Sequence, residues 1–235
     1  MRFQTPLIRA KLIRRYKRFL ADIVLEDGRI VTAHCANPGA MTGLAEPGTL
    51  IWVEPNNDAA RKLKFSWKLV ELAGGHFACV DTALPNTLVS EALAAGRVPG
   101  LGEFGGFRRE VRYGEKSRID FLLSGGESPD IYVEVKAVTL RRSGVLAEFP
   151  DTRTTRGTRH LDELADAVSG GFRAAMLYVV HRTDCEEFRV ARDVDPEYAA
   201  AFDKARRAGV QMLCQETEIS VDGVSLARPL AVLDG

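Results

Sequence analysis

The chain has 235 residues with 32 basic and 32 acidic side chains, so its formal net charge is zero, and 46% of its residues are hydrophobic. That composition is ordinary for a soluble globular protein of one large domain or two small ones. Because no apolar run reaches the length of a membrane span and no secretion signal opens the sequence, we expect a cytoplasmic protein with no membrane partner.

The four cysteines are scattered along the chain and form no Cys-x-x-Cys pair; they are Cys35, Cys79, Cys185 and Cys214. This spacing indicates neither a zinc site nor a disulfide framework, so we expect small buried thiols. A nucleophile built from Cys35 and the adjacent His34 is disfavoured, because neighbouring residues of a strand point to opposite faces.

Charge is unevenly distributed between the two parts of the chain. Residues 1–80 hold 12 Lys and Arg against 7 Asp and Glu, which leaves 20 against 25 for the rest. The first 21 residues contain seven basic side chains and no acid. Such clustering suits a phosphate backbone, although a solvated basic arm explains it equally well.

The first third of the sequence is typical of a small β-barrel. Strands are predicted at Phe19–Leu25, Arg29–His34, Thr49–Glu54 and Phe77–Asp81, with a short helix at Lys64–Leu72. Several short strands in about eighty residues favour an antiparallel barrel of the oligonucleotide-binding (OB) kind. We therefore expect an OB-like, nucleic-acid-binding domain over residues 1–83.

Basic and aromatic residues alternate in two segments of this predicted barrel, as in proteins that bind single strands. We expect Phe19 and Trp67 to be core residues and Tyr16 to be exposed. The candidate nucleic-acid contacts are Arg14, Arg15, Tyr16, Lys17, Arg18, Arg61, Lys62 and Lys64.

From residue 84 onward, helices alternate with strands, which predicts an α/β domain over residues 84–235. Asn86 is the expected cap of a first helix that ends at Gly96. The next predicted elements are a helix at Thr155–Val168, a strand at Ala174–His181 and a helix from Asp195 to Arg207.

A predicted hairpin of Ile119–Leu123 and Ile131–Val138 carries the main chemical signal of the sequence. Glu134 and Lys136 share one face of the second strand, and Asp120 on the first strand is within reach of Glu134. Two carboxylates and a lysine are suited to bind Mg²⁺ or Mn²⁺ together with a water that the metal activates. The alternative is a solvated ion pair of no chemical importance.

A second cluster surrounds the start of the helix at Thr155. Free backbone N–H groups and the helix dipole favour an anion at this position. The side chains predicted to bind a nucleic-acid phosphate there are Arg153, Arg156, Arg159 and His160. Alternatively, these arginines pair with nearby acids of the same domain.

The chain also resembles a known family. The motifs that carry the likeness extend from about Leu7 to Leu233 and include LADIVLEDG, TAHCANPGAM, LPNTLVSEAL, SRIDFLL, YVEVKAVTL and FPD-x-x-TTRG-x-x-HL-x-EL. They are similar to those of the sugar fermentation stimulation protein A family. The resemblance implies a DNA-binding protein linked indirectly to sugar use, with an N-terminal OB barrel and a C-terminal domain like PD-(D/E)xK nucleases.

The resemblance also implies roles for individual residues. Asp120 and Glu134 would be metal ligands, Lys136 would orient the attacking water, and Glu91 would be an additional acidic ligand. We therefore predict a DNA-binding protein with a divalent-metal-dependent nuclease-like centre. The alternative is a DNA-binding regulator whose nuclease fold has no activity, whereas a sugar-metabolising enzyme is disfavoured because no phosphate loop or cofactor motif is present.

Overall fold

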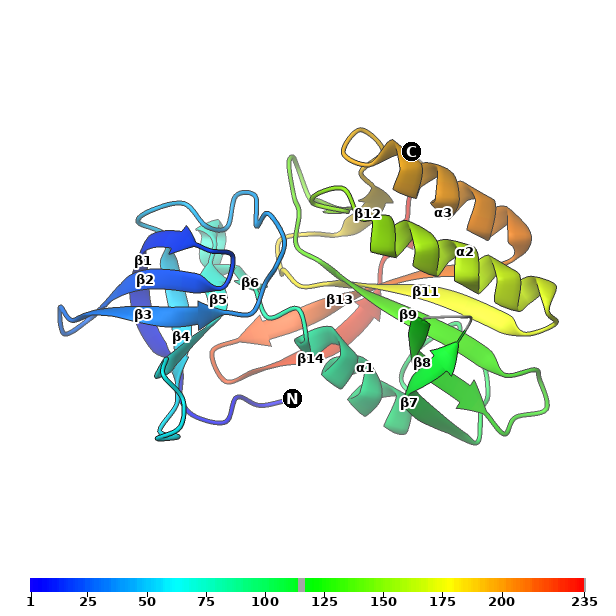
Figure 1. The fold of residues 1–235 in the computed structure, drawn as a ribbon, viewed down its shortest axis with the longest axis horizontal. Helices are drawn as coiled ribbons and strands as arrows, with labels where there is room; N and C mark the ends of the chain where they lie inside the picture. The colour runs from blue at the N-terminus through cyan, green and yellow to red at the C-terminus, as the bar shows by residue number, and fades with distance from the viewer. Residues whose placement is uncertain (114–116, 235) are drawn as a thin grey trace.

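The computed structural model describes residues 1–113 and 117–234. Figure 1 shows a barrel of strands beside a larger α/β domain, in which helices cover both faces of a sheet. The predicted fold class, an OB-like barrel followed by an α/β domain, is therefore confirmed.

The barrel is a closed ring of five strands in the order β3-β2-β1-β4-β5. It closes through parallel pairing of β3 and β5, in which His34 lies opposite Ser66 and Cys35 opposite Trp67. A short strand, β6 (Phe77–Cys79), extends the sheet beyond β5. The strands of the ring are β1 (Ile8–Tyr16), β2 (Leu20–Leu25), β3 (Ile30–Cys35), β4 (Leu50–Pro55) and β5 (Phe65–Glu71).

Two local predictions for the barrel are wrong. The segment expected to form a helix at Lys64–Leu72 is strand β5, because it pairs with β4 and β3 around the barrel and its Trp67 is fully buried in the barrel core. Phe19 was expected in the core but is 45% exposed, since it lies at the turn before β2 and stacks on His34. Tyr16 is half-buried, and its hydroxyl donates to Asp22.

The α/β domain is built on a six-stranded sheet in the order β14-β13-β11-β9-β8-β7. The three central strands β9, β11 and β13 run parallel, and the pairs at both edges are antiparallel. The predicted hairpin of Ile119–Leu123 and Ile131–Val138 is present as β8 and β9. The strands are β7 (Gly106–Tyr113), β8 (Ser117–Ser124), β9 (Ile131–Val138), β11 (Arg173–Val180), β13 (Gln211–Ser220) and β14 (Gly223–Pro229).

Three helices cover this sheet. Helix α1 (Leu84–Ala94) lies on one face, and α2 (Thr155–Ser169) and α3 (Pro196–Ala208) lie on the other (Figure 1). The side chain of Thr154 caps α2, and that of Asp195 caps α3, by accepting backbone N–H groups. A second, smaller sheet of parallel strands contains β10 (Leu146–Phe149), β12 (Glu187–Val190) and β15 (Ala231–Val232).

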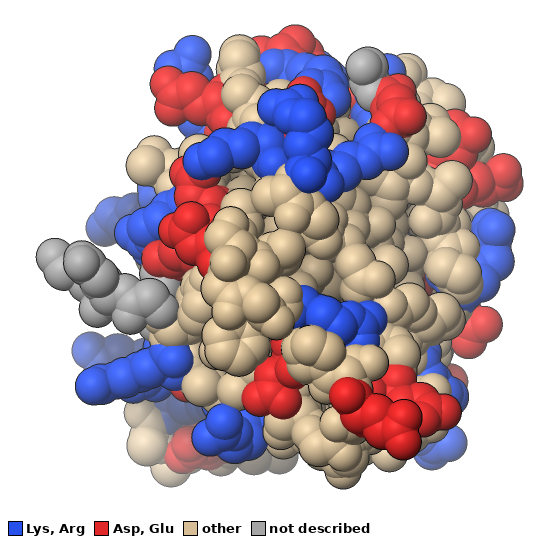
Figure 2. Space-filling model, turned by 90° about the vertical axis from the view of Figure 1, so that its right-hand side faces the viewer, with Lys and Arg blue, Asp and Glu red and all other residues tan. Residues whose placement is uncertain are grey.

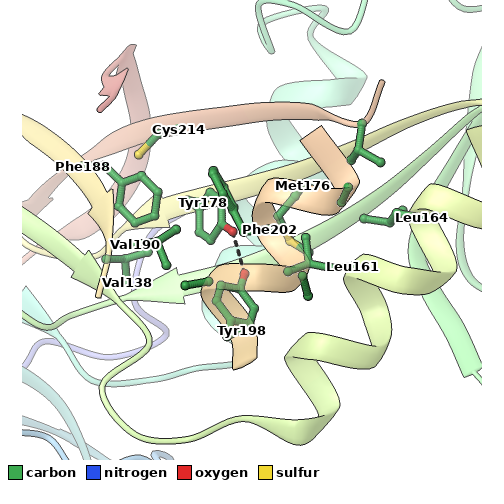
Figure 3. Close-up of a cluster of buried hydrophobic side chains, with 14 of the residues drawn as sticks. Val138, Leu161, Leu164, Met176, Tyr178, Phe188, Val190, Tyr198, Phe202 and Cys214 are labelled. Carbon is green, nitrogen blue, oxygen red and sulfur yellow. Dashed lines mark hydrogen bonds between the residues drawn. The ribbon is translucent and has the colours of Figure 1, made fainter. Parts of the chain in front are cut away.

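The core between the sheet and α2 and α3 is aromatic (Figure 3). Tyr178 of β11 and Tyr198 of α3 are fully buried, and their hydroxyls satisfy each other at 2.5 Å. Leu161 of α2 packs in the same cluster. This packing fixes α2 on the sheet. It thereby positions His160, which directly precedes Leu161 in α2.

The barrel and the α/β domain are joined by backbone hydrogen bonds. The N–H of Cys79 donates to the carbonyl of His181 at 2.8 Å, and the N–H of Thr183 donates to the carbonyl of Phe77 at 2.9 Å. The His181 ring is fully buried at this junction, and neither ring nitrogen has a hydrogen-bond partner among the residues that the structure describes. Burial lowers the pKa of His181 to about 4.

Three further features complete the description of the fold. All four cysteines are free and buried, as expected. Within residues 1–113 and 117–234, none of the helices is long and apolar enough to cross a membrane. The start of the chain lies on the second domain, because Arg2 pairs with Gly223 and the amine of Met1 donates to the carbonyl of Val224.

Candidate metal and nucleic-acid site

The candidate site lies where strands β8 and β9 separate. Their pairing includes Leu123 with Ile131 and ends at Phe121 with Val133. One residue beyond this last pair, the carboxylate of Asp120 accepts the backbone N–H of Val135 at 2.8 Å. The side chain of Asp120 therefore occupies the gap between the two strands and satisfies a donor that strand pairing would otherwise use.

Helix α1 holds the other oxygen of Asp120. The side-chain amide of Asn86 donates to Asp120 Oδ1 at 2.7 Å. The expectation that Asn86 caps the helix is wrong, because α1 begins at Leu84 and has no side-chain cap. Asn86 is thus a site residue that sequence reasoning missed, because it is separated from Asp120 by 34 positions and no local signal predicts their contact.

The position of Asp120 changes its acidity. Burial, and next the negative charge of Glu134, raise the pKa of Asp120 to about 6. The hydrogen bonds from Val135 and Asn86 oppose this shift without cancelling it. Two carboxylates close together in a buried site are a natural seat for a cation, which would favour their ionised forms.

Glu134 and Lys136 project from the same face of β9, as the alternation of a strand predicts. Lys136 Nζ donates to Glu134 Oε1 at 2.7 Å, and Glu134 is only 3% exposed. The two residues form a buried ion pair, and the alternative of a solvated surface pair is therefore wrong. A buried carboxylate of this kind needs its partners, because an uncompensated charge would be costly.

His160 of α2 completes this group. Its Nδ1 forms a short hydrogen bond with Glu134 Oε1 and lies 3.1 Å from Lys136 Nζ, while Arg156 Nε donates to its Nε2 at 3.3 Å. Burial alone would raise the pKa of Glu134, but the hydrogen bond from His160 and the charge of Lys136 lower it. The ring was expected to contact nucleic acid; it is 4% exposed and contacts Glu134 and Lys136 instead.

Glu91, the predicted third acidic ligand, lies elsewhere. It is exposed and pairs with the terminal amine of Met1 at 2.9 Å. It follows Asn86 by five residues, which places it about 140° around the helix from the side chain that reaches Asp120. The structure therefore does not bring Glu91 to the site, and the described residues contain no cluster of three or more His, Cys, Asp or Glu arranged to hold a metal.

The remaining donors still suit a hard divalent cation. Mg²⁺ is commonly bound through one or two carboxylates, with water and substrate phosphate in its other positions. Asp120 and Glu134 supply two such carboxylates; burial raises the pKa of Asp120 most, and the charge of Glu134, which a cation would offset, raises it further. A third acid is therefore not required for the residues present to fit this group.

A loop of the barrel borders the site. A cavity of about 220 Å³ lies between Asn37, Pro38 and Gly39 of that loop and residues of the α/β domain that include Lys136 and Asp151. Gly39 fits closely there, since a Cβ on this residue would lie 2.6 Å from a carboxylate oxygen of Asp151. The candidate site is thus bounded by both domains.

Arg15 holds this barrel loop in place. Its guanidinium donates to the carbonyls of Asn37 at 2.7 Å and Gly39 at 3.0 Å. These bonds occupy a side chain that was predicted to contact nucleic acid. The loop beside Lys136 therefore depends on Arg15 for its shape.

The other predicted nucleic-acid contacts differ in whether they have a partner within the protein. Arg14 pairs with Asp22, Arg159 pairs with Glu163, and Lys64 donates to the carbonyl of Asp58. The exposed members with no ion pair to a described residue are Lys17, Arg18, Arg61, Lys62, Lys64, Arg153 and Arg156.

Basic surface is also present on the α/β domain, in spite of its negative total charge. Figure 2 views the end of this domain that faces away from the barrel and shows Lys and Arg gathered in a band near the top of that face. Acidic groups surround the band, and a wide uncharged area lies below it. The charge balance of each half therefore does not locate the basic surfaces of the protein.

Comparison with known families and proteins agrees with the two-domain architecture. Residues 13–80 match a family model described as the SfsA N-terminal OB domain, and residues 83–223 match one described as the sugar fermentation stimulation protein RE domain. A sugar fermentation stimulation protein homolog of Roseobacter denitrificans is 58% identical over 99% of both chains. One of Ruegeria pomeroyi is 59% identical over 98% of this chain and all of its own.

A solved structure is similar over the whole molecule. It is described as Pyrococcus furiosus SfsA in complex with Ca²⁺ and aligns with a TM-score of 0.87 at 27% identity, covering 100% of this chain and 98% of the other. Both the barrel and the α/β domain are included in this alignment. Together with the family models and the relatives above, it shows that the chain belongs to the sugar fermentation stimulation protein A family.

Proposed function

We propose that this protein binds DNA and hydrolyses a phosphodiester bond at the site of Asp120, Glu134 and Lys136 with the help of a divalent cation. The observation that carries the proposal is the Asp120 carboxylate, held in the gap between β8 and β9 by Asn86 and Val135 beside the Glu134–Lys136 pair. Carboxylates on two adjacent strands with a lysine two residues after one of them form the pattern of PD-(D/E)xK nucleases.

Each residue of the site has a separate task in this proposal. Asp120 and Glu134 would hold Mg²⁺ or Mn²⁺, which supplies Lewis-acid stabilisation of the phosphate and lowers the pKa of a bound water. Lys136 orients the attacking water and offers a positive charge to the developing negative charge. His160 and Asn86 fix the side chains of Glu134 and Asp120 by the hydrogen bonds described above.

The relatives support the cation and the substrate class. The description of the similar structure includes Ca²⁺, a hard cation that takes oxygen ligands as Mg²⁺ does. An OB barrel beside the site is a fold that often holds oligonucleotides. Fold alone does not establish binding, so the proposal depends on the site and on its test.

The test combines calorimetry with a cleavage assay. Wild-type protein, Asp120→Asn and Glu91→Gln are titrated with Mg²⁺, Mn²⁺ and Ca²⁺ and incubated with single- and double-stranded DNA. We expect Asp120→Asn to lose both cation binding and cleavage while retaining DNA affinity. Glu91→Gln is the matched control, since it removes an acid that lies outside the site.

A wild-type protein that binds a cation but cleaves neither DNA form would contradict the catalytic half of the proposal. The site would then resemble that of a DNA-binding regulator with an inactive nuclease fold. One observation favours this second function, namely that Glu134 is already engaged by both Lys136 and His160. Loss of cation binding in Glu91→Gln would show that the ligands have been misassigned.

A further inference from the structure

The hairpin of β7 and β8 carries four exposed arginines next to the candidate site: Arg108, Arg109, Arg112 and Arg118. None of them forms an ion pair with an acid among the residues that the structure describes, whereas Arg9 and Arg14 of the barrel pair with acids there. The hairpin thus carries four arginines that have no ion-pair partner in the described part of the chain.

Two of these arginines point to the side of the sheet that carries α1. Val111 of β7 and Ile119 of β8 pack into the core on the opposite side, under α2 and α3. Arg112 follows Val111 and Arg118 precedes Ile119. Because neighbouring residues of a strand point to opposite faces, both arginines point away from this core. Their side chains therefore leave the sheet on the α1 side.

Arg109 joins them because the alternation of β7 is broken. Its guanidinium carbon lies 5.7 Å from the ring centroid of Phe121, which belongs to the core beneath α1. A regular strand would place Arg109 and Arg112 on opposite faces. Glu110, between them, has a left-handed backbone with φ of 51°, and this break brings Arg109 to the same side as Arg112 and Arg118.

The positions of Arg112 and Arg118 are unfavourable for the stability of the hairpin when no anion is bound. Arg112 and Arg118 are direct cross-strand neighbours. Like charges placed opposite each other in a sheet are destabilising, and no described acid relieves this pair. An anion bound between them would remove the repulsion.

The same surface adjoins Asp120. Arg118 precedes Asp120 by two residues on β8, and the pairs Arg109–Phe121 and Val111–Ile119 flank Asp120 on either side. Asp120 Oδ1 accepts a hydrogen bond from Asn86 of α1, so this oxygen lies toward the side of the sheet to which the arginines point. A polyanion lying along the hairpin would therefore extend to the Asp120 side of the candidate site, whereas Glu134 bonds to His160 of α2 on the other face.

We infer that Arg109, Arg112 and Arg118 form a phosphate-binding surface that aligns the backbone of a nucleic acid with the Asp120 carboxylate. The inference rests on the proposed function and names the surface by which its substrate is held. Guanidinium groups suit phosphate oxygens because they donate several N–H groups from one planar fork. The contacts are to the backbone, so they position the strand without reading its sequence.

The test measures the salt dependence of DNA affinity with a short fluorescein-labelled duplex and its single strand. Arg112→Ala/Arg118→Ala is compared with Arg97→Ala/Arg207→Ala, which removes the same charge from exposed positions after α1 and near the end of α3. We expect the hairpin variant to lower the slope of log K against log salt by about 2, one unit for each lost phosphate contact. The control should keep the wild-type slope.

Steady-state cleavage gives a second readout: the hairpin variant should raise KM and leave kcat unchanged. Equal slopes for the hairpin and control variants, with DNA binding intact in the wild type, would overturn the surface alone. A wild type that binds no DNA would overturn the surface and the proposed function together. If the alanine variant loses thermal stability, Arg112→Gln/Arg118→Gln, which keeps the side-chain length, decides by the same slopes.

Discussion

Strands β1 and β7 are both rich in arginine, yet their arginines have different surroundings. In β1, Arg9 pairs with Glu71, Arg14 pairs with Asp22, and Arg15 donates to loop carbonyls. In β7, Arg112 has no acidic partner within the described part of the chain and faces Arg118. A run of basic residues thus indicates a binding surface only when acids elsewhere in the fold leave its charge unpaired.

The largest expected effect is a loss of cleavage. It should distinguish the proposed chemistry of the α/β domain from DNA binding by the arginines of β1 or β7. Glu134→Gln removes a buried carboxylate that Lys136 and His160 both contact. We expect cleavage to fall by more than about 100-fold, since even outer partners of a metal site cost up to that much. The assay is DNA nicking in Mg²⁺, with salt-dependent DNA affinity measured alongside.

Arg14→Ala is the matched control for that variant, because its side chain pairs only within the barrel surface with Asp22 and the Tyr16 ring. Its cleavage rate should remain at the wild-type level. A comparable loss of cleavage in both variants would mean that β1 contributes to the reaction, and the contrast between the two strands would not hold.

The second prediction concerns the junction between the barrel and the α/β domain. Burial lowers the pKa of His181 to about 4, below its usual value. The unfolded chain therefore binds more protons than the folded one, so stability is present above the unfolded pKa and is lost as the pH falls toward 4. The loss should be on the order of 3 kcal/mol, from about 1.4 kcal/mol per unit of pKa shift.

Urea unfolding at pH 7.5 and at pH 4.5 measures the effect, because these two pH values lie within about one unit of the usual and of the lowered pKa of His181. His181→Asn removes the titrating ring and should flatten the dependence, while His34→Asn, an exposed histidine of the barrel, should leave it unchanged. An equally steep acid loss of stability in His181→Asn would assign the effect to other groups.

Much of the fold followed from patterns within the sequence. The hairpin of β8 and β9 was predicted because both strands alternate and a turn-rich loop joins them, and α2 was predicted from its apolar stripe. The helix expected at Lys64–Leu72 is wrong because closure of the barrel, which is a long-range effect, determines that β5 is a strand. Local propensity carries no information about that closure.

The site was predictable only where its members share one strand or one hairpin. Asp120, Glu134 and Lys136 were placed together by strand alternation and hairpin pairing. Asn86 and His160 reach them from helices on opposite faces of the sheet, through contacts that no spacing in the sequence encodes. Glu91 was proposed from family resemblance, and the geometry of α1 directs its side chain elsewhere.

Arg15→Ala gives a smaller effect and tests the structural role assigned to β1. The variant removes hydrogen bonds to the carbonyls of Asn37 and Gly39. We expect a loss of about 1–2 kcal/mol in the free energy of unfolding, because these acceptors are only partly compensated by water. Chemical denaturation measures this loss. An unchanged stability would mean that these hydrogen bonds do not hold the loop and that the Arg15 side chain is available to contact DNA.

The smallest effects are expected on the melting temperature in the absence of DNA, and only the β1 variant should lower it. Arg14→Ala removes an ion pair and should slightly lower the melting temperature. Arg112→Ala removes a like-charge neighbour of Arg118 and should leave the melting temperature unchanged or raise it. Differential scanning calorimetry at low salt measures both, since screening in high salt should abolish both differences. A lower melting temperature for Arg112→Ala would mean that Arg112 stabilises the hairpin, and the unpaired charge of β7 would then need no bound anion to explain it.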